Sequence, residues 1–286
     1  MLYFAYGSNL ERDDFDRWCE RHGHASGLLD DVVGPAALDD WALVFGRMSR
    51  SRGGGVLDLR PRPGFRTPGV VFDIEDEALA ALDQKEGHPH AYERREVVVD
   101  MGGKDLECVT YIGDTSSLTH HVPSATYLDI VRYGYQRFGL DTAALEAAAR
   151  AHEVGLVAAI DSLFVYGSLL VGERLHHYVS ELGPLSIEPA TIRGRLFDLG
   201  SYPGLMLDGG ALVRGERVRF ADISKALTIL DEVEGFHGRN VRDNLYERRV
   251  VDLDGGPAWT YLYAGPDEGV PIPSGEWRRW RGQDGR

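Results

Sequence analysis

Apolar and polar residues alternate over short stretches in much of the chain, and glycine or proline separates one stretch from the next. Residues 2–6 form such a stretch, and Gly7-Ser8-Asn9 interrupts it, which is typical of a short strand that runs into a tight turn. Residues 10–22 instead carry their less polar side chains at helical spacing. Further strands are predicted at 41–45, 53–59, 69–74, 96–99 and 107–112. Short strands joined by tight turns indicate a small barrel or a strongly curved sheet.

Three later segments of the first half have a helical pattern. Residues 76–85 form one of them, and Gly87 follows as a natural C-terminal stop. Residues 127–138 and 142–151 predict two more helices. Residues 154–161 then lead to another predicted strand, at 163–166.

From this strand onward the pattern repeats. Tyr3 to Leu10 (YFAYGSNL) has a counterpart in Phe164 to Leu170 (FVYGSLL). Further matches follow in the same order: LDQKEG at 82–87 with LDEVEG at 230–235, YERR at 92–95 with YERR at 246–249, and Thr-Tyr at 110–111 with 260–261. Matched landmarks in one order predict two homologous domains, which we place at residues 1–155 and 162–286.

The composition is that of a globular protein, with 43% hydrophobic and 27% charged residues. No apolar run approaches the roughly 18 residues that cross a bilayer, and the turn motif within the first ten residues leaves no room for a signal peptide. Cys19 and Cys108 are the chain's two cysteines and lack C-x-x-C spacing, so neither a disulfide framework nor a structural zinc site is indicated. We therefore expect a cytoplasmic protein.

The net charge of −14 argues against nucleic acid and anionic membranes as partners, because both reward clustered cations. Histidine pairs at 88/90, 120/121 and 176/177 suggest a metal site, but no Asp or Cys stands at ligand spacing beside them. Surface histidines are the better interpretation, and no metal is expected.

The repeated turn and glutamate together suggest a reaction. A glycine-containing turn at a strand end lets backbone N–H groups converge on a carboxylate or a developing oxyanion. Glu86 and its counterpart Glu234 stand at a helix C-terminus, where the helix dipole and partial burial both disfavour the ionised form and so favour proton exchange. A binding turn with one proton-shuttling carboxylate suits a substrate that supplies its own nucleophile.

These motifs resemble a known family. YFAYGSNL, the helix-ending Glu-Gly, and PSATY at 123–127 followed by a helix and Phe-Gly-Leu closely resemble the gamma-glutamylcyclotransferases. The second half resembles the related AIG2-like branch, with Tyr-Gly-Ser-Leu at 166–169 and Ser-Gly-x-Trp at 274–277. The resemblance implies an α+β fold: two tandem small mixed β-barrels with flanking helices.

In that family the substrate's α-amine attacks its own γ-carbonyl, which closes 5-oxoproline and expels an amine. By resemblance, Glu86 and Glu234 would be the general acid–base residues of two sites that bind a small γ-glutamyl molecule and need no cofactor. The residues that would hold the glutamyl group are Tyr6, Gly7, Ser8, Asn9 and Tyr127 in the first domain, and Tyr166, Gly167, Ser168 and Leu169 in the second.

Several alternatives stay open at this point. Glu86 could be a solvated helix-end charge, Tyr127 a buried structural tyrosine, and the YERR segments strand starts whose arginines pair with local carboxylates. One domain could be catalytic and the other structural, or the chain could bind γ-glutamyl compounds without chemistry. The sequence does not name the amine released.

Overall fold

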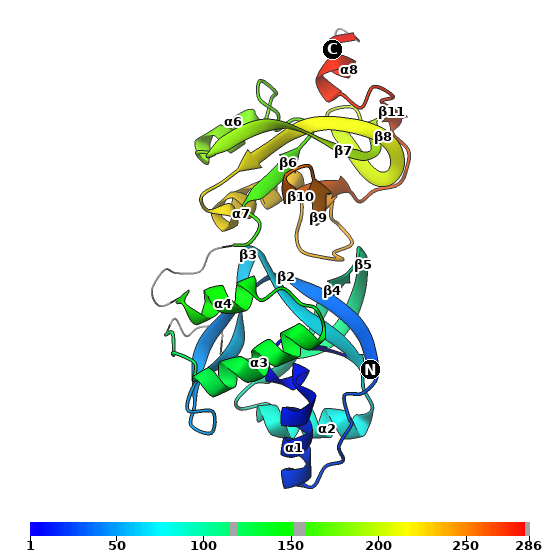
Figure 1. Cartoon of the computed structure of the whole chain (residues 1–286). Helices are drawn as coiled ribbons and strands as arrows, with labels where there is room; N and C mark the ends of the chain where they lie inside the picture. The colour runs from blue at the N-terminus through cyan, green and yellow to red at the C-terminus, as the bar shows by residue number, and fades with distance from the viewer. Residues whose placement is uncertain (115–118, 152–157, 284–286) are drawn as a thin grey trace. The chain divides into compact units, whose positions relative to one another are not determined.

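The computed structural model describes residues 1–114, 119–151 and 158–283 (Figure 1). The chain divides into two compact units, Met1–Ala159 and Ile160–Arg286. The predicted first boundary, at residue 155, lies outside the described residues. In the described part of the chain, no helix is both long and apolar enough to cross a membrane.

The first unit is built on a five-stranded closed barrel with the strand order β1-β3-β2-β4-β5. Its strands are β1 (Leu2–Ala5), β2 (Val32–Ser49), β3 (Gly54–Asp73), β4 (Glu93–Met101) and β5 (Lys104–Ile112). β1 pairs with β5 in parallel, and the other pairs are antiparallel. Buried side chains such as Phe4, Phe45 and Leu59 form its core.

Two long strands replace three of the predicted short ones. The glycines and prolines that interrupt the hydrophobic pattern bend β2 and β3 rather than ending them. The pairing of the two strands shifts register between Asp39 and Trp41, where Asp40 has a positive φ of 67° and accepts a hydrogen bond from the Gly64 N–H. A register shift absorbs the extra residue and lets both strands curve around the barrel.

Helices flank this barrel: four lie where the pattern predicted helices, and a short 3-10 helix lies at the predicted turn. They are η1 (Ser8–Leu10), α1 (Arg12–His22), α2 (Asp76–Glu86), α3 (Ala125–Arg137) and α4 (Ala143–Ala149) (Figure 1). Gly87 ends α2 in the left-handed conformation at φ 66°, which a glycine adopts without strain. Glu86 is therefore the last residue of the helix, and its position is set by a defined helix end.

The second unit repeats this arrangement as a curled half-barrel. Its strands are β6 (Ser162–Val165), β7 (Ser186–Asp198), β8 (Pro203–Arg219), β9 (Tyr246–Leu253), β10 (Gly256–Tyr263) and β11 (Val270–Pro271). The strand order is β11-β7-β8-β6-β10-β9, with the added β11 at the edge. Without β11 it corresponds to β2-β3-β1-β5-β4 around the first unit's barrel, and the β6–β10 pair is parallel like β1–β5. Three helices accompany them: α6 (His176–Glu181), α7 (Ile223–Glu234) and α8 (Trp277–Gln283). The predicted α+β fold with tandem domains is confirmed.

Each unit contains the same set of internal hydrogen bonds. The tyrosine that follows β1 or β6 donates a hydrogen bond to a backbone carbonyl of the parallel strand, β5 or β10. A threonine of that parallel strand donates to a backbone carbonyl of β1 or β6. An aspartate on α2 or α7 accepts hydrogen bonds from an arginine and from a second tyrosine. The bonds are Tyr6–Tyr111 O (2.7 Å), Thr110–Phe4 O (2.8 Å), Tyr111–Asp83 (2.6 Å) and Arg94–Asp83 (2.9 Å), against Tyr166–Tyr261 O (2.7 Å), Thr260–Phe164 O (3.0 Å), Tyr261–Asp231 (2.7 Å) and Arg248–Asp231 (2.8 Å). We call these bonds the repeated frame. They fix the glutamate-bearing helix against the sheet in each unit.

Candidate functional site

In the first unit the turn and the glutamate lie at one cavity of about 730 Å³. β1 ends at Ala5 and delivers the turn Gly7-Ser8-Asn9, while α2 ends at Glu86. Tyr6, the turn residues, Tyr127 and Glu86 all line the cavity, so the six residues predicted for this site are together. The volume is sufficient for a small-molecule ligand.

The glutamate is bonded directly to the turn. The Asn9 side-chain amide donates to Glu86 Oε1 at 2.9 Å and to the Tyr3 hydroxyl at 2.8 Å. Its carbonyl oxygen accepts a hydrogen bond from Lys85 Nζ. The Lys85 ammonium also lies 3.9 Å from Glu86 Oε1. Asn9 therefore has both ends of its amide fixed, and the carboxylate faces the turn rather than bulk solvent.

Lys85 is unusual because it is a nearly buried cation. Its side chain is 7% exposed, compared with 19% for Glu86. Burial lowers the pKa of Lys85, while the adjacent Glu86 carboxylate opposes this effect. A buried ammonium is costly unless it is paired and hydrogen-bonded. The second copy has Val233 at this position, so the fold does not require a charge beside the glutamate.

Tyr92 and Tyr127 also line the cavity, and both bond to the backbone of Leu57. Tyr92 donates from its hydroxyl to the Leu57 carbonyl at 2.8 Å, and the Leu57 N–H donates to the Tyr127 hydroxyl at 3.2 Å. Burial raises the pKa of Tyr127 to about 12, so its hydroxyl stays protonated near neutral pH. Tyr127 is thus both a buried packing residue and part of the cavity lining.

The YERR segments combine structural and lining roles. Arg94 binds Asp83 at 2.9 Å and Arg95 binds Glu93 at 2.9 Å, as in the structural interpretation of these arginines. Tyr92, however, lines the cavity and was not predicted there.

An ion pair closes the side of the cavity near α1. Arg52 contacts Asp14 through two hydrogen bonds of 2.8 and 2.5 Å. Burial raises the pKa of Asp14, but the hydrogen bond and charge of Arg52 outweigh it and lower the pKa overall. Ser124, the N-cap of α3, donates to the Arg52 carbonyl at 2.6 Å. The start of α3, and with it Tyr127, is tied to the cavity.

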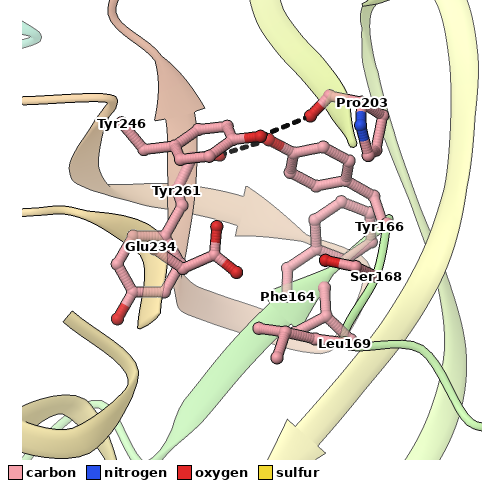
Figure 2. A pocket seen from close by; sticks show the side chains of 10 residues that line it. Phe164, Tyr166, Ser168, Leu169, Pro203, Glu234, Tyr246 and Tyr261 are labelled. Carbon is pink, nitrogen blue, oxygen red and sulfur yellow. Dashed lines mark hydrogen bonds between the residues drawn. The ribbon is translucent and has the colours of Figure 1, made fainter. Parts of the chain in front are cut away.

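The second unit brings the matching residues together around a much smaller space. Tyr166, Gly167, Ser168, Leu169 and Glu234 surround a cavity of about 20 Å³, enough for about one water molecule. Figure 2 shows the Glu234 carboxylate directed into this space, which Pro203 and Tyr246 also line. All five residues predicted for this site are adjacent, but a glutamyl group does not fit.

Three replacements account for the difference between the two cavities. Asn9 corresponds to Leu169, Lys85 to Val233, and Leu57 to Pro203. The last pair is matched by a hydrogen bond: the Pro203 carbonyl accepts from the Tyr246 hydroxyl at 2.6 Å, and the Leu57 carbonyl accepts from the Tyr92 hydroxyl. The Pro203 ring occupies the space beside the turn: its Cγ stands 2.5 Å from where a Cβ on Gly167 would lie, whereas Leu57 stays 3.9 Å from the same point on Gly7. The polar partners of the glutamate are thus replaced by apolar side chains.

Glu234 responds to this apolar setting. Burial raises the pKa of Glu234 to about 7. Within the described residues the Glu234 carboxylate has no hydrogen-bonding or ionic partner like Asn9 or Lys85. Desolvation without a compensating charge favours the neutral acid.

Comparison with known proteins now identifies the family. The family described as "Gamma-glutamyl cyclotransferase, AIG2-like" matches residues 3–129 and again residues 163–279. The chain belongs to this family. It carries two copies of the gamma-glutamyl cyclotransferase domain and is an enzyme of that type.

Three relatives illustrate the similarity. The gamma-L-glutamyl-butirosin B gamma-glutamyl cyclotransferase of Niallia circulans is 37% identical over 42% of this chain and 77% of its own length. The gamma-glutamylcyclotransferase family protein YtfP of Escherichia coli K12 is 33% identical over 40% of the chain and 94% of its own. Human gamma-glutamylcyclotransferase is 30% identical over 49% and 72%. Each aligned region covers no more than half of this two-domain chain.

The sequence did not reveal all of the residues that line the first unit's cavity. Lys85, Arg52 and Tyr92 were missed, although Lys85 had a visible signal. It stands beside Glu86 where the second copy has Val233, so the two copies differ in charge next to their shared glutamate. No three His, Cys, Asp or Glu side chains gather in a metal-binding arrangement within the described ranges.

Proposed function

We propose that the first unit cyclises a γ-glutamyl compound to 5-oxoproline and releases the free amine. The observation that carries this proposal is the Asn9–Glu86 hydrogen bond of 2.9 Å, which joins the turn to the carboxylate inside a cavity of about 730 Å³. A general base must lie within hydrogen-bond reach of the proton it takes. A ligand held at the turn would meet this condition at Glu86.

In the proposed reaction Glu86 first accepts a proton from the substrate's α-ammonium. The freed amine attacks the γ-carbonyl carbon, forming the ring C–N bond and a tetrahedral oxyanion that backbone N–H groups near Gly7 and Ser8 would stabilise. The intermediate collapses, and the bond from the γ-carbon to the leaving nitrogen breaks. Both protons lost by the α-nitrogen end on the leaving nitrogen through Glu86, so the carboxylate returns to its starting state.

We further propose that the second unit does not catalyse this reaction. The observation behind this is the cavity of about 20 Å³ around Glu234, together with the apolar Leu169 and Val233 at the positions of Asn9 and Lys85. The alternative is two active sites, which would require Pro203 to move away from the turn at Gly167.

The test is 5-oxoproline release from a panel of γ-glutamyl dipeptides and amines. Glu86→Gln keeps the side chain's size but cannot accept the ammonium proton, so kcat should fall roughly 10²–10⁴-fold, the usual contribution of a positioned acid–base group. Glu234→Gln is the matched control and should retain wild-type turnover. Full activity in Glu86→Gln would reject the mechanism, whereas loss of activity in Glu234→Gln would make the second unit catalytic.

A further inference from the structure

The cavity of the first unit is basic although the chain carries a net charge of −14. Its lining includes Arg21, Arg47, Arg50, Arg52 and Lys85, while Glu86 is the carboxylate among the described lining residues. The corresponding cavity of the second unit is lined by Glu234 and by no lysine or arginine. The positive charge is therefore a property of the first site and not of the fold.

Two of these five cations are already neutralised by the protein. Arg52 forms its paired contact with Asp14, and Lys85 lies 3.9 Å from Glu86. For Arg21, Arg47 and Arg50 no carboxylate lies within ion-pair distance in the described parts of the chain. Arg21 donates to the Arg17 carbonyl at 3.0 Å, and the Arg47 guanidinium lies 5.2 Å from the centre of the Tyr92 ring.

Several other arginines of the same unit have acidic partners: Arg66 binds Asp39 at 2.6 Å, and Arg132 binds Glu146 at 2.7 Å. Arg62 and Arg137 instead lie against the rings of Phe65 and Phe138. What sets Arg21, Arg47 and Arg50 apart is that all three line one cavity. An arginine guanidinium is suited to a carboxylate or phosphate that it can contact through two parallel hydrogen bonds.

The cavity's cations differ in exposure. The Lys85 side chain is 7% exposed, whereas Arg21 and Arg50 are exposed and Arg47 is half-buried beside the Tyr92 ring. A γ-glutamyl group has one carboxylate and one ammonium, which the turn and Glu86 suffice to hold. Arg21, Arg47 and Arg50 are then the cations of this cavity that are left to meet the amine that the reaction releases.

We infer that the released amine is an acidic one: the substrate is a γ-glutamyl compound whose leaving portion carries two or more carboxylates, as in an acidic amino acid or a short acidic peptide. This inference rests on the proposed function. Arg47 and Arg50, at the end of β2 and in the turn that follows it, are the residues that select for these carboxylates, assisted by Arg21 on α1.

The test compares γ-glutamyl-glutamate with γ-glutamyl-glutamine, which has nearly the same shape but lacks one charge. We expect wild-type kcat/KM to be at least tenfold higher for γ-glutamyl-glutamate, and we expect this ratio to shrink as ionic strength rises. Arg47→Gln and Arg50→Gln should each lower the ratio about three- to tenfold. Arg95→Gln removes an arginine outside the cavity and should leave the ratio unchanged.

The outcomes separate this inference from the function beneath it. Turnover of both dipeptides, or of γ-glutamyl-lysine, without preference for the acidic leaving group overturns the inference and leaves the cyclotransferase proposal intact. Release of 5-oxoproline from none of the three overturns both. A preference that survives in Arg47→Gln and Arg50→Gln overturns the assignment of these arginines.

Discussion

Lys85 is the residue that most clearly distinguishes the two sites. Its ammonium fixes the Asn9 carbonyl, and the Asn9 amide in turn faces Glu86. A buried charge of this kind does not stabilise a fold as an apolar side chain would. Its value is therefore in positioning Asn9, and through Asn9 the Glu86 carboxylate, before substrate binds.

Replacing Lys85 with methionine tests that role. We expect kcat/KM to fall about tenfold, because the Asn9 carbonyl loses its hydrogen-bond donor and the amide that faces Glu86 is no longer held in place. The melting temperature should not drop, since methionine can fill the same buried path. An unchanged kcat/KM would show that Asn9 keeps its position without Lys85.

Glu234 makes a separate, thermodynamic prediction. Its pKa of about 7 lies above the usual value of about 4.3. Between these values the folded state keeps a proton that the unfolded state has released, so this group's stabilising contribution is complete at low pH and declines as the pH rises to about 7. One pKa unit corresponds to about 1.4 kcal/mol, so a shift from about 4.3 to about 7 gives an upper limit of about 4 kcal/mol.

Glu234→Gln removes this titration. The free energy of unfolding of the variant, measured with urea, should gain on that of wild type between pH 5 and pH 8. Glu232→Gln changes an exposed glutamate on the same helix and should follow the wild-type profile. Parallel pH profiles for wild type and Glu234→Gln would mean that Glu234 is solvated.

At the site, the residues that sequence reasoning found are those with a repeated motif, such as Gly7 and Glu86. Those it missed reach the cavity from strands and loops distant in sequence: Arg52 follows β2 and Tyr92 precedes β4. Spacing along the chain carries no information about which strands will be neighbours. That depends on closing the barrel.

Among the elements, helices were located more accurately than strands. Gly87 marks the end of α2 by a local requirement for positive φ, which the sequence displays directly. By contrast, the glycines and prolines around Gly64 read as strand ends but are bends within β3. Whether such a residue ends a strand or bends it depends on the partner strand, which no local pattern contains.

Helix α3 packs against the turn through Gly134. A Cβ at this position would lie 2.6 Å from the Leu10 Cβ and 2.9 Å from its backbone carbon. Gly134→Ala should therefore destabilise the first unit by about 1–3 kcal/mol, although alanine normally stabilises a helix by about 1 kcal/mol relative to glycine. KM should also rise, because Leu10 follows the turn.

Gly282→Ala is the control for this experiment. It is also a helical glycine, in α8, and nothing lies within 4 Å of the added Cβ. Thermal unfolding should show it to be neutral or slightly stabilised. Equal effects of the two substitutions would show that α3 can shift away from the turn without cost.

For the whole chain, the proposal that only the first unit's cavity is functional predicts one ligand per molecule. Glu86→Gln should bind a γ-glutamyl dipeptide without converting it, so calorimetric titration of this variant should give a stoichiometry near one. The double substitution Gly7→Val and Glu86→Gln places a bulky side chain in the first turn and should abolish the signal. A stoichiometry of two would show that the cavity at Glu234 opens to admit ligand.

The repeated frame has a consequence for how such a chain can diverge. Asp83, Arg94 and Tyr111 hold the helix end in place, as do Asp231, Arg248 and Tyr261 in the other copy, and the side chains of Asn9, Lys85 and Leu57 take no part in these bonds. Mutations at these three positions can therefore accumulate without dismantling the domain. In a chain with two such domains, selection can preserve the reaction in one copy. The residues around the glutamate of the other copy can then change, and the shape of its pocket with them.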